Sequence, residues 1–450
     1  MSIKKYIFAI YISTFFSFLL PISQTRASVI RLITDTQTEA LVRNMIDPLL
    51  AKEGLIQEQI DIYIVADNSL NAFVAGGLNI FVTTGLFLEL SSYSEVQGVL
   101  AHELGHIAGG HLSKRSSAMK DEMIKATIFG VLSLGVGVIA GEGKNGIELG
   151  TAGLLAAPEF ARKNMMSFSR TAEYSADTFG LYALAEAGIS SRGLIKALRK
   201  INKLHGDRER RRNIYNSTHP FSEDRILQME QIIADNPELQ KGRRETPDET
   251  ENFEMVKAKI QGFFLDKDRW KKTDHNDITE IWFNIKNHNG KMAVDNCSRI
   301  VKDKSSRNYA FLLEACSRAY YELGQFKTSL KFIDSAIDEI NPKKYPNTKK
   351  TQLIQFAGIV AFQNDEIDKA IRLLKYSLTL DKNSPRSWLL LAQIYGSQKN
   401  TAMQNYSFAE YFYSINDLNK ARQFAKKAII LLDENTAESI NLKDILTIQR

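Results

Sequence analysis

Apolar residues follow two different spacings in the first part of the chain. Residues 36–50 carry apolar side chains every three or four positions, which predicts a helix. Residues 60–65 and 78–82 alternate apolar and polar positions, which predicts half-buried strands, and residues 71–75 form another strand between them. A Gly-Gly pair at 76–77 supplies a turn. The pattern predicts a small sheet in an otherwise helical α+β domain.

The first 27 residues have the pattern of a secretory signal. Lys4 and Lys5 precede an uncharged, mostly apolar run from Tyr6 to Leu20, and small residues stand at the expected cleavage position near Ala27. The run is too short for a membrane span, and its surroundings carry no cysteine for a lipid anchor. We expect residues 1–27 to be removed and the mature protein to work outside the cytoplasm, most simply in a bacterial periplasm.

Two further apolar pieces, 127–140 and 154–157, flank a Gly-rich stretch. Each piece is too short to cross a bilayer. The segment 127–157 is therefore expected either to pack as a hairpin over the first domain or to dip into a membrane surface, and the pattern leaves both alternatives open. The second alternative would make the protein peripheral to a membrane.

The second half of the chain has a helical repeat. A polar stretch begins near Asn236, and a helix from Phe253 to Phe264 leads out of the first domain. Beyond about Ile278, helical pairs recur at a period of about 34 residues, with small residues where helices must approach closely, as in tetratricopeptide repeats. The residues that mark the four repeats are Gly324 with Ala336, Gly358 with Ala370, Trp388 with Tyr395, and Ala409 with Ala421. The predicted boundaries are a signal peptide at 1–27, a first domain at 28–245, a linker helix at 246–275, repeats at 276–436 and a tail at 437–450.

Charge and cysteine content narrow the function classes only slightly. The formal net charge of +6 is too weak on a chain of this length to predict nucleic-acid binding. Cys297 and Cys316 are the only cysteines and fall on neighbouring predicted helices. In an oxidising compartment they could form a disulfide, but two buried thiols would fit the same pattern.

Candidate chemistry is concentrated in a helix predicted over residues 94–107. His102 and His106 are four residues apart, so both imidazoles project from one side of the helix and can share a metal ion. Glu103 lies beside them, within reach of a water on that metal. The apolar neighbours leave little of the helix polar enough to be a solvated face, which argues against two solvated histidines. The HExxH pattern therefore predicts a zinc hydrolase with one Zn²⁺ per chain.

A catalytic zinc needs a third protein ligand and one open position. His111 follows the motif, but a continuous helix would turn it about 180° away from His102. Glu173 is the stronger candidate, because Asp177 lies four residues further along the same predicted helix. Glu173 can bind the metal while Asp177 accepts the free N–H of a ligand histidine. Alone, two solvated acids would explain this pair equally well; beside HExxH, we interpret Glu173 as the third ligand.

The order of these motifs resembles the gluzincin metalloproteases that include the CaaX prenyl protease and its soluble bacterial relatives. The HExxH helix is followed by the Glu173 helix and then by His219, Pro220 and Arg225, which match the family's His-Pro-x-x-x-x-Arg motif. Within this family the chain is most similar to periplasmic members that carry tetratricopeptide repeats. The resemblance implies an α+β zincin-like metalloprotease domain, mostly helical with a small sheet, followed by an all-α tetratricopeptide-repeat domain.

The resemblance also implies roles for individual residues. It makes His102, His106 and Glu173 the zinc ligands and Glu103 the base, and it places His219 and Arg225 close to the metal, where they supply or support a donor to the oxyanion. The substrate-binding edge that it implies, which could pair with an extended peptide backbone, consists of Asn71, Ala72, Phe73, Val74 and Ala75. His219 has an alternative role, because as a fourth zinc ligand it would fill the open position and silence the site at rest.

Three functions fit these patterns. The first, implied by the resemblance, is an endopeptidase that cleaves misfolded or stalled outer-membrane proteins and assists their assembly as a chaperone, with its repeats docked on the outer-membrane assembly machinery. The second is a repeat scaffold or chaperone with a latent protease site. The third is a zinc hydrolase that acts on something other than protein, against which the edge strand argues.

Overall fold

The computed structural model describes residues 32–53, 60–75, 78–110, 168–204, 219, 223–302, 308–343, 345, 348–382 and 384–448. Several sequence predictions lie outside these residues. They are the signal peptide at 1–27, the turn at 76–77, the hairpin at 127–157, His111 and Pro220. None of the helices within the described ranges combines the length and the apolar character needed to cross a membrane.

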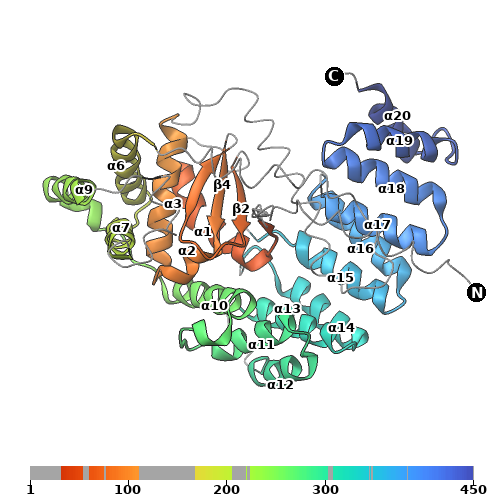
Figure 1. Cartoon of the computed structure of the whole chain (residues 1–450), viewed down its shortest axis with the longest axis horizontal. Helices are drawn as coiled ribbons and strands as arrows, with labels where there is room; N and C mark the ends of the chain where they lie inside the picture. The colour runs from red at the N-terminus through yellow and green to blue at the C-terminus, as the bar shows by residue number, and fades with distance from the viewer. Residues whose placement is uncertain are drawn as a thin grey trace, which may run out of the picture.

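A four-stranded sheet forms the centre of the first domain (Figure 1). Its strands are β1 (Leu32–Ile33), β2 (Asp61–Val65), β3 (Ala72–Ala75) and β4 (Asn79–Thr83), in the order β1-β2-β4-β3. The two central strands are parallel, and each outer strand is antiparallel to its neighbour. The alternating pattern therefore predicted β2, β3 and β4 correctly, whereas the short β1 was not predicted. The strand β3 lies at an edge of the sheet.

Helices cover one face of the sheet. Residues of α1 (Thr36–Glu53) and α3 (Tyr93–Ala108) share a buried core with Ile64, Ile80 and Val82 of the strands. On the opposite face Tyr63, Phe81 and Phe73 stack in a row, with ring centroids 5.1 and 4.9 Å apart. Within the described residues the domain also contains the α-helices α2 (Thr84–Glu89), α6 (Arg170–Glu186), α7 (Arg192–Leu204) and α9 (Glu223–Asp235). The N-terminal half is thus a mostly helical α+β domain.

The helix α10 (Pro247–Phe264) belongs to two hydrophobic cores. Phe253, Val256 and Ile260 are buried in the core of the first domain, whereas Met255 and Ala258 are buried in the core of the next helices. The helix begins six residues before the predicted Phe253, because Pro247 occupies its first turn and Thr246 and Glu249 form a capping box. A connecting helix was predicted over this segment, and the structure shows that the helix is also a shared packing element.

The C-terminal half is a curved array of antiparallel helices (Figure 1). Its helices are α11 (Asn276–Lys286), α12 (Gly290–Ile300), α13 (Tyr309–Glu322), α14 (Phe326–Glu339), α15 (Thr351–Gln363), α16 (Ile367–Leu380), α17 (Pro385–Ser397), α18 (Thr401–Ser414), α19 (Leu418–Ile429) and α20 (Ala437–Thr447). The first three hairpins, α11 with α12, α13 with α14 and α15 with α16, agree with the predicted helical pairs. Beyond them, tight turns at Lys399 and Asn416 join α17 to α18 and α18 to α19, so the third and fourth predicted repeats share α18.

The predicted tail at 437–450 is wrong as far as Thr447. Thr436 caps α20 by accepting from the backbone of Ser439 at 3.2 Å. Leu442 and Ile445 on this helix are buried against α18 and α19. A short amphipathic helix therefore covers the end of the array, because its apolar side chains three residues apart fall on one face.

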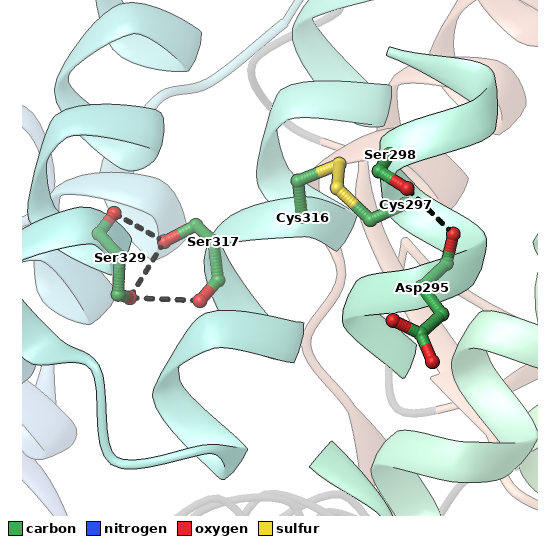
Figure 2. The surroundings of a disulfide bond; sticks show 6 residues. All are labelled: Asp295, Cys297, Ser298, Cys316, Ser317 and Ser329. Carbon is green, nitrogen blue, oxygen red and sulfur yellow. Dashed lines mark hydrogen bonds between the residues drawn. A yellow bond between two sulfur atoms is a disulfide. The ribbon is translucent and has the colours of Figure 1, made fainter. Parts of the chain in front are cut away.

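A disulfide joins two helices near the start of the array. Cys297 on α12 and Cys316 on α13 are bonded, with their Cα atoms 5.3 Å apart (Figure 2). Next to this bond, the Ser317 hydroxyl donates to the backbone carbonyl of Ser329 on α14 at 2.8 Å. Of the two alternatives that the sequence left open, the structure contains the disulfide.

Polar contacts join the first domain to the array. The Thr36 hydroxyl donates to the side-chain carbonyl of Gln352 on α15 at 2.9 Å, and the Gln352 amide donates to Glu39 at 2.8 Å. Lys259 on α10 pairs with Asp35 and lies 3.7 Å from the carboxylate of Glu314 on α13. The N-terminal end of α1 therefore contacts α15 directly and is linked to α13 through Lys259 of α10.

Candidate metal centre

The helix α3 holds the HExxH residues in the interior of the first domain. The hydroxyl of Ser92 caps its first turn by accepting from the backbone of Glu95 at 3.3 Å. Val99, Leu104 and the neighbouring apolar residues are buried around the helix. His102, Glu103 and His106 are themselves completely buried. Two solvated histidines, the alternative to a metal site, are thereby excluded.

A glycine inside the motif sets the distance between α3 and α6. A Cβ atom on Gly105 would lie only 2.7 Å from the Cα of Ala176, so any side chain at Gly105 would push α6 away. The helix α6 starts after Ser169, whose hydroxyl accepts from the backbone of Ala172 at 3.2 Å. Its first turn carries Glu173, and the close approach brings that carboxylate opposite the two histidines.

Four buried side chains offer ligand atoms around one point. One atom each from His102, His106, Glu173 and His219 lies within 4.8 Å of the others. The Nε2 atoms of the two α3 histidines are 3.1 Å apart, and they lie 3.4 and 3.5 Å from the Glu173 carboxylate. Imidazole nitrogens and a carboxylate oxygen are the donors that zinc takes in catalytic sites, so the residues fit this metal.

The carboxylate of Asp177 fixes the orientation of His102. Its Oδ1 lies 2.8 Å from His102 Nδ1. An ionised carboxylate only accepts hydrogen bonds, so Nδ1 carries the proton and the Nε2 lone pair can face the ligand cluster. The contact of Asp177 with a histidine of α3 agrees with the sequence analysis, and metal binding by Glu173 stays a prediction.

The guanidinium of Arg225 clamps two carboxylates together. Its Nε and Nη2 each donate to Asp177 at 2.7 Å, and its Nη1 lies 2.7 Å from Glu173 Oε2. The side chain is 2% exposed, so these bonds form away from water. Arg225 was grouped with the catalytic residues as supplying or supporting an oxyanion donor. The structure shows another role, because its donors contact the carboxylates of Asp177 and Glu173 and hold these two side chains in place.

Burial and hydrogen bonds shift the pKa values of the ligands. Burial lowers the pKa of His106 to about 3, which leaves this imidazole neutral and able to bind a metal. Burial opposes ionisation of Glu173, but its bonds to the surrounding histidines outweigh this and lower its pKa. For His102, burial is outweighed by the bonds to Asp177 and Glu173, which raise its pKa to about 9. A metal ion must therefore displace a proton from His102 when it binds.

Glu103 lies beside this cluster with a carboxylate suited to accept a proton. Both of its oxygens are buried, and neither accepts a hydrogen bond within the part of the chain that the structure describes. Burial raises the pKa of Glu103 above the ordinary value for a glutamate, which makes its carboxylate a stronger base. His219 Nε2 lies 3.3 Å from Glu103 Oε1.

His219 faces both the cluster and the base. Its Nδ1 lies 3.3 Å from His102 Nε2 and 3.2 Å from Glu173 Oε1, and the residue is completely buried. The ring of Phe168 stacks on His106 with centroids 3.8 Å apart and approaches His219 at 5.6 Å. Phe168 was given no role from the sequence. Its position directly before the cap of α6 is the signal that could have identified it.

The strand β3 presents a free edge beside α3. Within the described residues, no strand pairs with β3 on the side away from β4. The backbone N–H of Thr83 donates to the carbonyl of Asn71 at 3.1 Å, so Asn71, Phe73 and Ala75 face β4 by alternation. The backbone groups of Ala72 and Val74 therefore point towards the free edge.

Comparison with known proteins agrees with this geometry. Residues 36–233 match peptidase family M48, and they include all four clustered residues and Glu103. The chain therefore carries a peptidase M48 domain.

The chain is also similar to proteins that are named as proteases. The chain is 27% identical to the β-barrel assembly-enhancing protease of Yersinia pestis over 180 residues, which is 40% of this chain and 36% of that protein. It is 23% identical to the β-barrel assembly-enhancing protease of Escherichia coli K12 over 240 residues, 52% of this chain and 45% of the relative. The matches thus span less than half the length of these relatives.

Proposed function

We propose that the chain, with its peptidase M48 domain, is a periplasmic zinc endopeptidase that cleaves misfolded or stalled outer-membrane proteins. The observation that carries the proposal is the buried cluster of His102, His106, Glu173 and His219 beside the carboxylate of Glu103. The secretory pattern at residues 1–27 supports a periplasmic location. The names of the relatives from Yersinia pestis and Escherichia coli support a role in outer-membrane protein assembly.

Different residues in and around the cluster have different roles in the proposed peptide hydrolysis. His102, His106 and Glu173 would hold one Zn²⁺, which supplies positive charge to polarise the scissile carbonyl and to make a water more acidic. Glu103 accepts the proton of the attacking water and passes it to the leaving amine. Asp177 and Arg225 keep His102 and Glu173 in orientation throughout.

Removal of the metal tests the proposal most directly. We expect chelation of zinc to lower the cleavage of an unfolded outer-membrane protein by about 100-fold or more, because the carbonyl then loses its Lewis acid. Addition of one equivalent of Zn²⁺ should restore the rate. Cleavage is measured from fragments on a gel against time, with the metal content of each sample determined in parallel. A metal-free sample that cleaves at the original rate contradicts the proposal.

The free edge of β3 fits the binding of an extended substrate. A peptide that pairs with the outward backbone groups of Ala72 and Val74 adds a strand to the sheet, and its recognition does not depend on its side chains. Such recognition suits an enzyme whose substrates share misfolding rather than a sequence.

A proline in the edge strand tests this mode of binding. We expect Val74→Pro to lower kcat/KM about fivefold, because the variant lacks the N–H that faces the substrate and one hydrogen bond contributes about 1 kcal/mol. Val74→Ala is the matched control, since it shortens the same side chain and keeps that N–H. Equal kcat/KM for the two variants would exclude pairing of the substrate with Val74.

We further propose that His219 keeps the enzyme latent as a fourth ligand. Its Nδ1 faces His102 and Glu173, and its Nε2 contacts Glu103. One side chain can therefore fill the open coordination position of the metal and also block the proposed base. His219→Ala should change the rate of proteolysis while one zinc per chain remains, because His102, His106 and Glu173 are still present. The measurements are the rate of fragment release and the zinc stoichiometry. A zinc-free variant would show that His219 is an essential ligand instead of a latch.

The helical array favours a second candidate function. A curved array of this kind offers a binding surface, so the chain could act mainly as a tetratricopeptide-repeat chaperone or scaffold for the outer-membrane assembly machinery, with a latent protease site. The two functions differ in their dependence on Glu103, since only the endopeptidase requires this residue.

A further inference from the structure

Three aromatic side chains form a row across the sheet, on the face away from α1 and α3. Tyr63 of β2 lies directly opposite Phe81 of β4, and Phe81 lies directly opposite Phe73 of β3. Their rings stack, with interplanar angles of 21° and 7°. The row therefore runs across the strands and ends at Phe73, on the edge strand.

The row is buried at its centre and partly exposed at the edge strand. Phe81 is 5% exposed, whereas Phe73 is only half-buried. One face of the Phe73 ring lies against Phe81, so the opposite ring face is directed away from β4, towards the free edge. In the part of the chain that the structure describes, no other ring contacts Phe73. The row therefore ends in a ring face that is directed to where the proposed substrate strand would lie.

The backbone pattern determines which substrate residue would meet Phe73. Because Ala72 and Val74 point their backbone groups outward, Phe73 makes no backbone hydrogen bond to a strand on that side. At such positions of an antiparallel pair, the opposed Cα atoms are about 4.5 Å apart and the side chains are closest. The ring spacings in the row, 5.1 and 4.9 Å, are close to the ordinary distance of about 4.8 Å between strands. One more strand would therefore place a side chain in line with the row.

We propose that Phe73 selects an aromatic side chain at one position of the substrate, the residue directly opposite it on an antiparallel strand. The bound side chain stacks on the outer face of the Phe73 ring and becomes the fourth member of the row. Pairing of the backbones alone is independent of sequence, so this contact adds a preference at a single position. The inference rests on the proposed endopeptidase function, and it makes extended segments with an aromatic residue the favoured substrates.

Peptides with one movable aromatic residue test this preference. The substrates are fourteen-residue peptides of Ser and Thr that carry Phe at the seventh residue, Phe at the ninth residue, or Ser at both. We expect each Phe peptide to be cleaved with a kcat/KM about fivefold higher than that of the peptide without Phe, as one aromatic cross-strand pair implies. Because Phe73 sets the register, moving Phe by two residues should move the cleaved bond by two residues, which mass spectrometry of the fragments measures.

Substitutions at Phe73 complete the test. Phe73→Val should cleave the three peptides with equal kcat/KM, because it keeps an apolar, strand-forming residue but lacks the ring. Phe73→Tyr keeps a ring and should keep the preference. Phe332 of α14 is the matched control, since it is also half-buried and stacks on Tyr320 at 5.2 Å, and Phe332→Val should keep the preference. Melting temperatures show which variants are folded, and the peptide series on the wild-type chain decides the proposal without them.

The outcomes separate this inference from the proposed function. Equal kcat/KM for peptides with and without Phe on the wild-type chain overturns the role of Phe73, as do cleavage sites that do not follow Phe or an unchanged preference in folded Phe73→Val. Absence of zinc-dependent cleavage of every peptide would instead refute the endopeptidase. Binding of the same peptides, labelled with rhodamine and followed by fluorescence anisotropy, then decides. Tighter binding of the Phe peptides supports the role of Phe73, and equal affinity, including no binding, overturns it.

Discussion

Replacement of Glu103 by Gln will lower the rate of peptide hydrolysis about a thousandfold, while the protein stays folded and keeps its metal. Gln has nearly the same shape but cannot accept a proton, and general-base catalysis contributes a factor of this order. His102, His106 and Glu173 are unchanged in the variant, so its metal content should equal that of the wild type. The measurement is the initial rate of cleavage of an unfolded outer-membrane protein, with zinc determined on the same samples.

Glu95 provides the matched control for this substitution. It is a second buried glutamate on α3, and its carboxylate accepts from the backbone of Ser91 at 2.7 Å instead of facing the cluster. Glu95→Gln should cleave at the wild-type rate. Cleavage by Glu103→Gln at that same rate would refute the assigned mechanism. Full function of Glu103→Gln in cells that lack the protein would favour the chaperone or scaffold alternative.

Replacement of Arg225 by Leu will lower the free energy of unfolding of the metal-free peptidase domain by about 3–5 kcal/mol. The loss arises because Asp177 and Glu173 keep their buried charges and lose the cation that both of them contact. Urea denaturation of the metal-free protein measures the change, and zinc binding should weaken as the two carboxylates move apart. Arg225→Lys should recover only part of the loss, since one ammonium group cannot reproduce the fork that contacts both carboxylates.

An exposed ion pair supplies the comparison for Arg225. Arg243 contacts Glu249 at 2.7 Å, but its side chain is 45% exposed. Arg243→Ala should therefore lower the free energy of unfolding by less than about 1 kcal/mol. If the substitutions at Arg225 and Arg243 had equal effects, burial of the clamp would not be the source of its stability.

The ligands on helices followed from local spacing, whereas the role of Arg225 did not. Four-residue separations place His102 with His106 and Glu173 with Asp177 on common faces, and this holds wherever the helices pack. The partners of Arg225 depend on how α9 packs against α6, which no local pattern specifies. Local sequence could therefore predict these same-face pairs, but the contacts of Arg225 required the three-dimensional structure.

For two helices, α10 and α20, the sequence indicated only part of what the structure shows. In α10, apolar residues from Phe253 to Ile260 occupy more than one face, which indicates two packing partners, but the polar and proline-containing flanks favoured a linker. In α20, Leu442 and Ile445 have the spacing of a buried face, yet the segment is too short for its periodicity to stand out from an irregular tail.

If the chain is the endopeptidase proposed above, the contribution of α10 to both cores would affect which substrates it cuts. A helix that is packed into two hydrophobic cores cannot act as a flexible tether, because bending it would open one core or the other. The array and the catalytic groups are consequently held at a constant separation. A polypeptide anchored on the array would meet Glu103 at a set number of residues from its anchor point, so chain length would determine which bonds are cut.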